Sequence, residues 1–334
     1  MKINSNNISS LDLFRGMAGY GVAICHFYYY TYYLNDFQFY SIFFVEFFFI
    51  LSGFVLYPQL KKVYLDKKNI KVFYYRRWFR TIPPYIVALA CYSILFGKFD
   101  NDTLKYLFFV QKVFDNFINF DYFSVAWSLS VEEFFYLIFP FFLLIFNKNR
   151  FLNILFLFIL VVYILKISYF FNDVDKEFYR IGTFLRLDSI AFGVLARVYF
   201  DKIKNNTINV LLALLISISM YYFFMNLHEL KNSELFLFIF LIQIFSINMI
   251  IIFVNFNNLI KNKLLTGFFS LLSKQTYSIY LFHLIIIHFF NSNTFLMNSN
   301  FIFIYYLISI FIFSSLFYYL FEKVIIENRP SYNK

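Results

Sequence analysis

The stretch LDLFRGMAGYGVAICHFYYYTYYL, residues 11–34, is apolar enough to lie in lipid, yet it carries Asp12, Arg15 and His26. Arg15 and His26 are 11 residues apart, close to three turns, so an α-helix places them on one face, roughly 16 Å apart along its axis. Asp12 lies one turn before Arg15 and joins that face. Ionisable residues inside a membrane are costly and usually face a bundle interior or a wet cavity. The pattern predicts a membrane helix with a functional polar face.

A plainer interpretation of the same three residues stays open. Asp12 and Arg15 can form an ion pair at the cytoplasmic edge of the membrane, and His26 can be a hydrogen-bonded packing residue. The rest of the chain bears on the choice.

The composition indicates lipid as the solvent. Of the 334 residues 61% are hydrophobic and 26% aromatic, whereas soluble domains are about 45–50% apolar. The 55 Phe residues would leave large apolar patches on a water-soluble protein. Apolar runs of roughly 20 residues, long enough to cross a bilayer as helix, occur about ten times. They cover 11–34, 38–58, 79–97, 126–146, 150–171, 180–200, 207–227, 234–256, 265–290 and 299–322.

The basic residues predict the orientation of these ten helices. With the N-terminus inside, 20 of the 29 Lys and Arg residues lie in inside segments and 6 in outside segments. This bias follows the positive-inside rule, so we expect an all-α integral membrane protein with both termini cytoplasmic. The net charge of +10 therefore reports topology, and no nucleic-acid-binding module is visible.

Other features set limits on the fold and chemistry. Cys25 and Cys91 both lie in predicted spans, so no disulfide framework is expected. We expect one transmembrane domain over 1–334, with a retained first helix, no attached soluble domain and no metal site. The longest outer connection, 98–125, could carry a short amphipathic helix at 103–113.

Six sequence blocks occur in a recognisable order along the chain. They are R-x10-H within LDLFRG…H (Arg15, His26), VEFFFILSGF (45–54), RWFRTIPPY (77–85), WSLSVEEFFYLIFP (127–140), RLDSIAFGVLA (186–196) and YSIYLFH (277–283). Together they resemble the membrane acyltransferase-3 family, in the form without a fused periplasmic esterase-like domain. Glu46 stands where that family frequently has Asp.

The resemblance implies a single bundle of ten helices in the bacterial cytoplasmic (inner) membrane. It also implies O-acyl transfer, usually of acetyl from cytoplasmic acetyl-CoA, to a hydroxyl of an envelope glycan such as a polysaccharide or a lipopolysaccharide O-antigen. The acceptor, its hydroxyl, the acyl group and the oligomeric state do not follow from the sequence.

Acyl transfer needs a base, polarisation of the thioester carbonyl and a binding site for CoA. His26 is the natural base because a buried imidazole stays neutral near physiological pH, and His283 is a second intramembrane candidate. His288 is more typical of a structural residue, and His228 falls in an outer loop. Arg15, at the cytoplasmic end of its helix, could meet the donor.

Arginines of the third span are expected to bind the phosphates of CoA. Arg77 and Arg80 are three residues apart and share a helix face, and Arg76 lies four before Arg80. Guanidinium groups bind phosphate through paired hydrogen bonds. We expect Pro83 and Pro84 to break the helix beside them and open space for the ligand. The neighbouring lysines are better explained by topology or by lipid headgroups.

Buried acids and their neighbours complete the candidate site. Glu132 lies one turn before Tyr136 on the same face, with Trp127 nearby; it could orient a histidine, pair with Arg15 or bind the acceptor. Glu46 and Asp188 are further buried acids, and pairing, for example with Arg186, is the plain alternative for any of them.

Three classes of function remain: an O-acyltransferase, a transporter or flippase of a lipid-linked glycan or small solute, and a glycan polymerase or ligase without CoA. Buried charges and broken helices also suit a transporter. A flippase, however, has no need of an arginine pair for phosphate combined with a mid-membrane base, so the acyltransferase is favoured.

Overall fold

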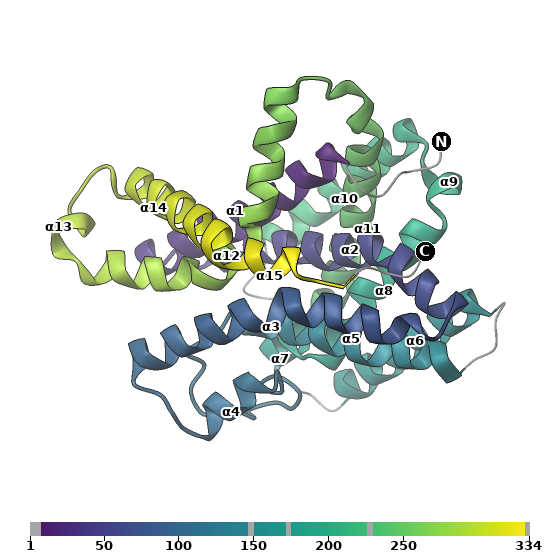
Figure 1. The fold of residues 1–334 in the computed structure, drawn as a ribbon, viewed down its shortest axis with the longest axis horizontal. Coiled ribbons are helices and arrows are strands. Elements are labelled where there is room, and N and C mark those ends of the chain that lie inside the picture. The colour runs from purple at the N-terminus through teal and green to yellow at the C-terminus, as the bar shows by residue number, and fades with distance from the viewer. Residues whose placement is uncertain (1–7, 146–149, 172–174, 226–229, 331–334) are drawn as a thin grey trace. The chain divides into compact units, whose positions relative to one another are not determined.

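The computed structural model describes residues 8–145, 150–171, 175–225 and 230–330, and within these ranges all regular structure is helical. The chain forms two compact units. Figure 1 shows the helices coloured along the chain, from purple at the N-terminus to yellow at the C-terminus. Unit 1 holds residues 1–48 and 252–328, and unit 2 holds 49–251 and 329–334. The boundaries fall within α2 and α11. The expectation of one transmembrane domain stays a prediction.

Unit 1 is built around α1 and α12. Its elements are α1 (Ser9–Tyr32), the start of α2 (Asp36–Leu65), the end of α11 (Asn232–Phe256), η2 (Asn257–Leu259), α12 (Lys263–Ser292), α13 (Thr294–Met297), α14 (Ile302–Phe317), the π-helical turn η3 (Tyr318–Glu322) and α15 (Lys323–Glu327). In its core Phe27 of α1 stacks on Tyr306 of α14, with ring centroids 4.6 Å apart, and the Tyr306 hydroxyl donates to the Ala23 carbonyl at 3.0 Å. These contacts fix α1 against α14.

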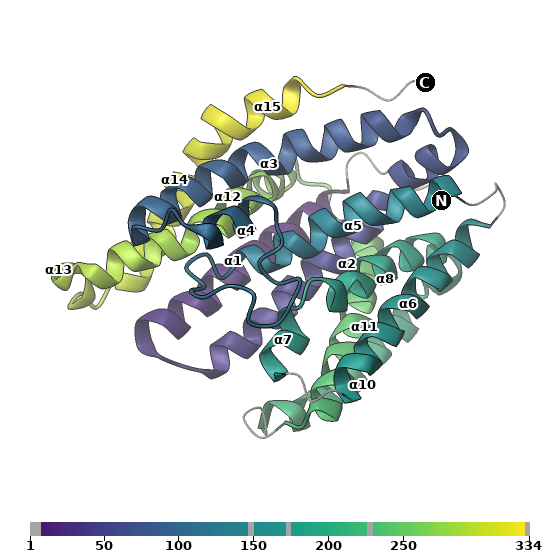
Figure 2. The same ribbon diagram turned by 90° about the horizontal axis from the view of Figure 1, so that it is seen from below.

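Unit 2 holds the remaining helices. They are the rest of α2, α3 (Asn69–Phe96), α4 (Asn101–Leu107), α5 (Ala126–Ile145), α6 (Phe151–Phe171), α7 (Lys176–Ile181), η1 (Phe184–Arg186), α8 (Leu187–Val198), α9 (Phe200–Ile203), α10 (Asn206–Met225) and most of α11. Helices α5, α6 and α8 pack against one another (Figure 2).

Glycines allow the closest helix crossing of unit 2. A Cβ on Gly53 of α2 would lie 1.9 Å from the Ile190 carbonyl oxygen of α8, and one on Gly193 would lie 2.1 Å from the Ile50 oxygen. Only glycine lets two backbones approach this closely, as in other membrane helix pairs. This contact explains why the SGF block of α2 has glycine at position 53.

Within the described residues, seven helices are long and apolar enough to cross a membrane. They are Asp36–Leu65, Asn69–Phe96, Ala126–Ile145, Phe151–Phe171, Asn206–Met225, Asn232–Leu259 and Ile302–Glu327. The prediction of a multi-pass helical membrane protein is confirmed. Helices α1 and α12 have 24 and 30 residues, so they are about 36 and 45 Å long. Their polar side chains lower their mean hydropathy. The count of ten spans and the sides of the termini stay predictions.

The predicted span 180–200 is not one continuous helix. Helix α7 ends at Ile181, Gly182 is extended, and a 3₁₀ turn precedes α8, which has only 12 residues. Twelve helical residues cover about 18 Å, too little for the roughly 30 Å hydrocarbon layer. Arg186 and Asp188 make this segment too polar for a uniform lipid-facing helix, and it is instead buried within unit 2.

The expected break at Pro83 and Pro84 is also wrong, because α3 continues through both residues. Proline lacks an N–H, so the carbonyls of Phe79 and Arg80 cannot receive their usual helical hydrogen bonds. In membrane bundles, neighbouring helices and side chains commonly supply replacement hydrogen bonds for such carbonyls. The two prolines therefore weaken the helix locally without ending it.

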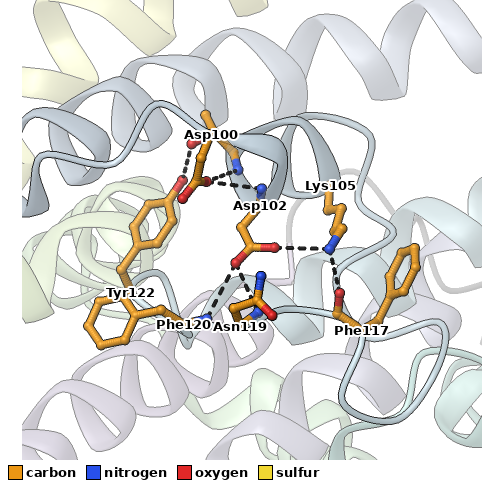
Figure 3. Close-up of polar contacts among 8 residues, drawn as sticks. Asp100, Asp102, Lys105, Phe117, Asn119, Phe120 and Tyr122 are labelled. Atoms are coloured by element: carbon orange, nitrogen blue, oxygen red, sulfur yellow. Dashed lines mark hydrogen bonds and ion pairs between the residues drawn. The ribbon is translucent and has the colours of Figure 1, made fainter.

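The connection over residues 98–125 folds around the carboxylate of Asp102 (Figure 3). One oxygen accepts from Lys105 Nζ at 2.9 Å, and the other accepts from the backbone N–H groups of Asn119 at 2.9 Å and Phe120 at 3.4 Å. Asp100 caps α4 by accepting from the backbone of Asp102 at 3.0 Å. The amphipathic helix expected at 103–113 is present but shorter and earlier, as α4, because the chain turns back after Leu107.

The pKa of Asp102 makes this segment sensitive to acid. Burial alone would raise the pKa, but the hydrogen bond from Lys105 and those from the backbone outweigh it and lower the pKa below its usual range. A lowered folded-state pKa stabilises the fold above the unfolded value, about 3.9, and this stability is lost as the pH falls through the folded pKa.

We therefore expect residues 98–125 to become susceptible to a protease active in acid as the pH falls below about 4. Asp102→Asn should make the segment susceptible at neutral pH, tested with a protease active at that pH, because an amide cannot accept all three bonds. Asp115→Asn, in the same segment, is the matched control. Cleavage of the reconstituted protein that is independent of pH in the wild type would contradict this role of Asp102.

Candidate functional site

Helices α1 and α12 of unit 1 run parallel in close contact. A Cβ on Gly16 would lie 2.7 Å from the Leu272 Cβ, and one on Gly19 would lie 2.8 Å from the Thr276 Cγ2. These two glycines are thus positions where α12 packs against α1. This close packing brings the polar side chains of the two helices together.

Arg15 and Asp12 lie at one end of this helix pair. The Arg15 Nη1 donates to the Ser273 hydroxyl at 3.0 Å and lies 3.7 Å from the Asp12 carboxylate. Arg15 and His26 both contact α12, so the prediction that they share a helix face is confirmed. The Asp12–Arg15 ion pair of the plainer interpretation is also present.

His26 and His283 form the polar centre of unit 1. The His26 Nδ1 lies 2.8 Å from the His283 Nε2, and the two rings are nearly parallel, at 18°. His283 is fully buried, and its Nδ1 lies 3.0 Å from the backbone carbonyl oxygens of both Ile279 and Tyr280. The sequence offered these histidines as separate candidates, and the structure joins them by a hydrogen bond.

Glu132 is the centre of a second polar cluster, in unit 2. The Tyr136 hydroxyl donates to the Glu132 Oε2 at 3.1 Å and lies 2.8 Å from the Ser52 hydroxyl. The predicted pairing of Glu132 and Tyr136 on one face of α5 is therefore present. Ser52, which the sequence did not indicate as a site residue, joins α2 to this cluster.

Two arginines of α3 face the same carboxylate. Both Arg77 and Arg80 interact electrostatically with Glu132, and the Arg77 guanidinium lies over the Tyr136 ring, 5.2 Å from its centroid. Arg77 is 9% exposed, and its Nε has no hydrogen-bond partner among the described residues. Glu133 also interacts electrostatically with Arg77, so two carboxylates accompany the two guanidiniums. The buried Nε of Arg77 is the group that suits an anion such as phosphate.

Neighbouring charged residues have structural contacts. Glu133 accepts hydrogen bonds from the side chains of Thr81 and Trp78. The Arg76 Nη1 donates to the Pro330 carbonyl at 2.6 Å, which ties α3 to the C-terminal segment. The expected role of Arg76 in binding the donor stays a prediction.

The remaining candidates are buried within their own units. Trp127 packs edge-on against Phe49, with ring centroids 5.8 Å apart, and Glu46 of α2 is fully buried in unit 1. These positions suit either a structural or a functional role.

Asp188 is paired with a lysine that the sequence did not connect to it. The Lys166 Nζ of α6 lies 2.5 Å from the Asp188 Oδ2, and Gln243 of α11 donates to the same oxygen at 3.1 Å. Both charged side chains are almost wholly inaccessible, at 3% and 0% exposure. Lys166 was visible as a cation within an apolar run, but its partner is 22 residues away on another helix. The suggested partner, Arg186, donates to the Arg180 carbonyl at 3.1 Å.

Comparison with known proteins identifies the family. Residues 8–323 match the acyltransferase-3 family, described as an acyltransferase domain, and the chain belongs to it. It is 34% identical over 123 residues to the peptidoglycan O-acetyltransferase OatA of Listeria monocytogenes, which covers 31% of this chain and 20% of the relative. It is 26% identical over 278 residues to the O-acetyltransferase OatA of Staphylococcus aureus, covering 74% of this chain and 46% of the relative. The chain thus spans less than half the length of these relatives. No solved structure matches it.

The Lys166–Asp188 pair allows a direct test of whether Asp188 has a chemical role. Lys166→Met should lower the free energy of unfolding by about 3–5 kcal/mol, because it leaves a buried carboxylate without its cation. Adding Asp188→Asn to this variant should restore most of the melting temperature, since no buried charge then remains. A fully active double variant would make the pair structural; a stable, inactive one would give Asp188 a chemical role. No loss of stability in Lys166→Met would contradict the importance of the pair.

Proposed function

We propose that this chain is an integral-membrane O-acetyltransferase that moves acetyl from cytoplasmic acetyl-CoA to a hydroxyl group of an envelope glycan. The observation that carries the proposal is the imidazole of His26, half-buried within α1 and hydrogen-bonded to a second, fully buried imidazole. A positioned, neutral imidazole is the side chain best suited to take a proton from a hydroxyl near neutral pH. Family membership and the names of the relatives support acetyl transfer to a glycan.

The proposed reaction is a direct transfer. His26 takes the proton of the acceptor hydroxyl as the oxygen attacks the thioester carbon. The new C–O bond forms, the C–S bond breaks, and the departing CoA sulfur receives the proton from the His26 imidazolium. The base is thereby regenerated, and the balance requires no further reactant.

Arg77 and Arg80 would hold the phosphates of CoA. Their guanidiniums face one carboxylate, and the Nε of Arg77 is buried with no described partner, so an anionic ligand would complete their hydrogen bonding. Glu132 would keep the pair oriented through the Tyr136 and Ser52 contacts. Arg15, tied to Asp12 and Ser273, would interact with the donor from α1.

The proposed class of acceptor rests on the names of the relatives and on the predicted orientation of the protein in the membrane. Peptidoglycan, another polysaccharide or a lipopolysaccharide O-antigen each offers hydroxyls outside the bacterial cytoplasmic membrane. Mass spectrometry of envelope glycans from cells with and without the protein would identify the acceptor by the loss of one acetyl mass per site.

His26→Ala should abolish acetyl transfer while acetyl-CoA still binds, because the variant loses the base and keeps the arginines. His288→Ala, on an exposed position of α12, is the matched control and should remain active. Rapid quenching with radiolabelled acetyl-CoA and no acceptor distinguishes two routes. A stoichiometric labelled protein that disappears in His26→Ala would replace the direct route by a covalent intermediate. Normal transfer by His26→Ala would disprove the role of the base.

Arg77→Ala and Arg80→Ala should each weaken CoA binding about 10- to 100-fold, since a charge-assisted hydrogen bond contributes roughly 1.5–3 kcal/mol. Isothermal titration on the purified protein measures this, and the same loss should appear when wild type binds a CoA analogue lacking phosphate. Lys71→Ala, an exposed cation on the same helix, is the control for general charge effects. Unchanged affinity in both arginine variants would remove the phosphate assignment.

A further inference from the structure

The contacts of His283 determine where its proton lies. Its Nδ1 is 3.0 Å from two backbone carbonyl oxygens, those of Ile279 and Tyr280. Carbonyl oxygens only accept hydrogen bonds, so Nδ1 must be the nitrogen that carries the hydrogen. The two carbonyls belong to the preceding turn of α12, so the helix itself supplies both acceptors.

The proton of His26 follows from that of His283. A neutral imidazole has one N–H, so the His283 Nε2 carries a lone pair and must accept the hydrogen bond. Its partner at 2.8 Å is the His26 Nδ1, which must therefore donate. The hydrogen of His26 is then on Nδ1, and its Nε2 bears the lone pair.

We infer that His283 is a positioning residue, which holds His26 in the tautomer whose Nε2 can take the hydroxyl proton. The inference rests on the proposed function, in which His26 is the base. A free neutral histidine side chain prefers its hydrogen on Nε2, the arrangement that would leave this nitrogen unable to act as a base. The contacts of His283 reverse that preference.

The packing around the pair keeps this geometry. His283 is fully buried between neighbouring side chains of unit 1, and the contacts of Gly16 and Gly19 hold α1 close against α12. Tyr306 fixes the α1 backbone at Ala23, one turn before His26. The two rings therefore approach each other without a flexible connection.

The hydrogen bond should strengthen during the reaction. When His26 takes the proton it becomes an imidazolium, and its Nδ1–H then donates a charge-assisted bond to the His283 Nε2. An interaction that is stronger in the transition state than in the ground state accelerates the chemical step. In serine hydrolases a carboxylate orients the histidine base in the same way; here the orienting group is neutral.

Nitrogen NMR can read the tautomers directly, because the chain contains only four histidines. The protein, labelled with ¹⁵N-histidine and reconstituted in lipid, gives a distinct shift for protonated and unprotonated ring nitrogens, and single substitutions assign them. In the wild type, His26 and His283 should both carry hydrogen on Nδ1. His283→Gln places an amide oxygen close to the original Nε2 and should preserve this state of His26, whereas His283→Leu should abolish it. His288→Gln is the matched control on the same helix.

The kinetic test uses the same variants. His283→Leu should lower kcat about a hundredfold or more with the KM for acetyl-CoA nearly unchanged, and His283→Gln should recover much of the loss. A purely structural role would instead lower the melting temperature of both variants and would leave the His26 tautomer of the folded fraction unchanged.

Two results would overturn the inference in distinguishable ways. Hydrogen on the Nε2 of wild-type His26, or an unchanged His26 spectrum in His283→Leu, disproves the positioning role even if the protein transfers acetyl. The second result is that the spectra are as expected but the wild type transfers no acetyl from acetyl-CoA to isolated envelope glycan. This result disproves the proposed function and, with it, the catalytic part of the inference.

Discussion

Every polar group within the hydrocarbon layer must find its partner inside the protein, because lipid offers none. This constraint determines which helices pack together. Arg15 donates to Ser273, and Lys166 pairs with Asp188, in each case between two helices of one unit. The glycines at positions 16 and 19 let α1 approach α12 closely enough for the Arg15–Ser273 contact. Those at positions 53 and 193 allow the close crossing of α2 and α8. Polar pairing selects the helix neighbours, and small residues set their distance.

The two polar clusters satisfy this constraint in different ways, one with neutral groups and the other with charged groups. In unit 1 the two imidazoles satisfy each other and two backbone carbonyls, so they need no ion. In unit 2 two guanidiniums face Glu132, whose carboxylate is also held by Tyr136. A neutral pair suits proton transfer, and a guanidinium whose buried N–H has no hydrogen-bond partner among the described residues suits an anionic ligand. Each cluster thus matches one requirement of acyl transfer.

The sequence predicted what depends on helical periodicity and little of what depends on tertiary contact. The shared face of Arg15 and His26 and the pairing of Glu132 with Tyr136 follow from spacing along one helix. The partners of His26 and Asp188 lie 257 and 22 residues away, on other helices, where spacing carries no information. Continuous helix through Pro83 and Pro84 was missed because neighbouring contacts outweigh the local penalty. The break within 180–200 was missed because the burial of Arg186 and Asp188 is a tertiary feature.

A histidine is better suited than a carboxylate to orient the proposed base His26 in the buried core of unit 1. A carboxylate beside His26 would place a charge in surroundings of low polarity, and burying an ion costs several kcal/mol unless it is paired. Glu132 illustrates this requirement, because it faces two arginines. His283 needs no such compensation, since its only N–H is satisfied by carbonyls of its own helix. The neutral partner gives up some electrostatic stabilisation of the imidazolium, but the resting pair then places no charge in the buried core of unit 1.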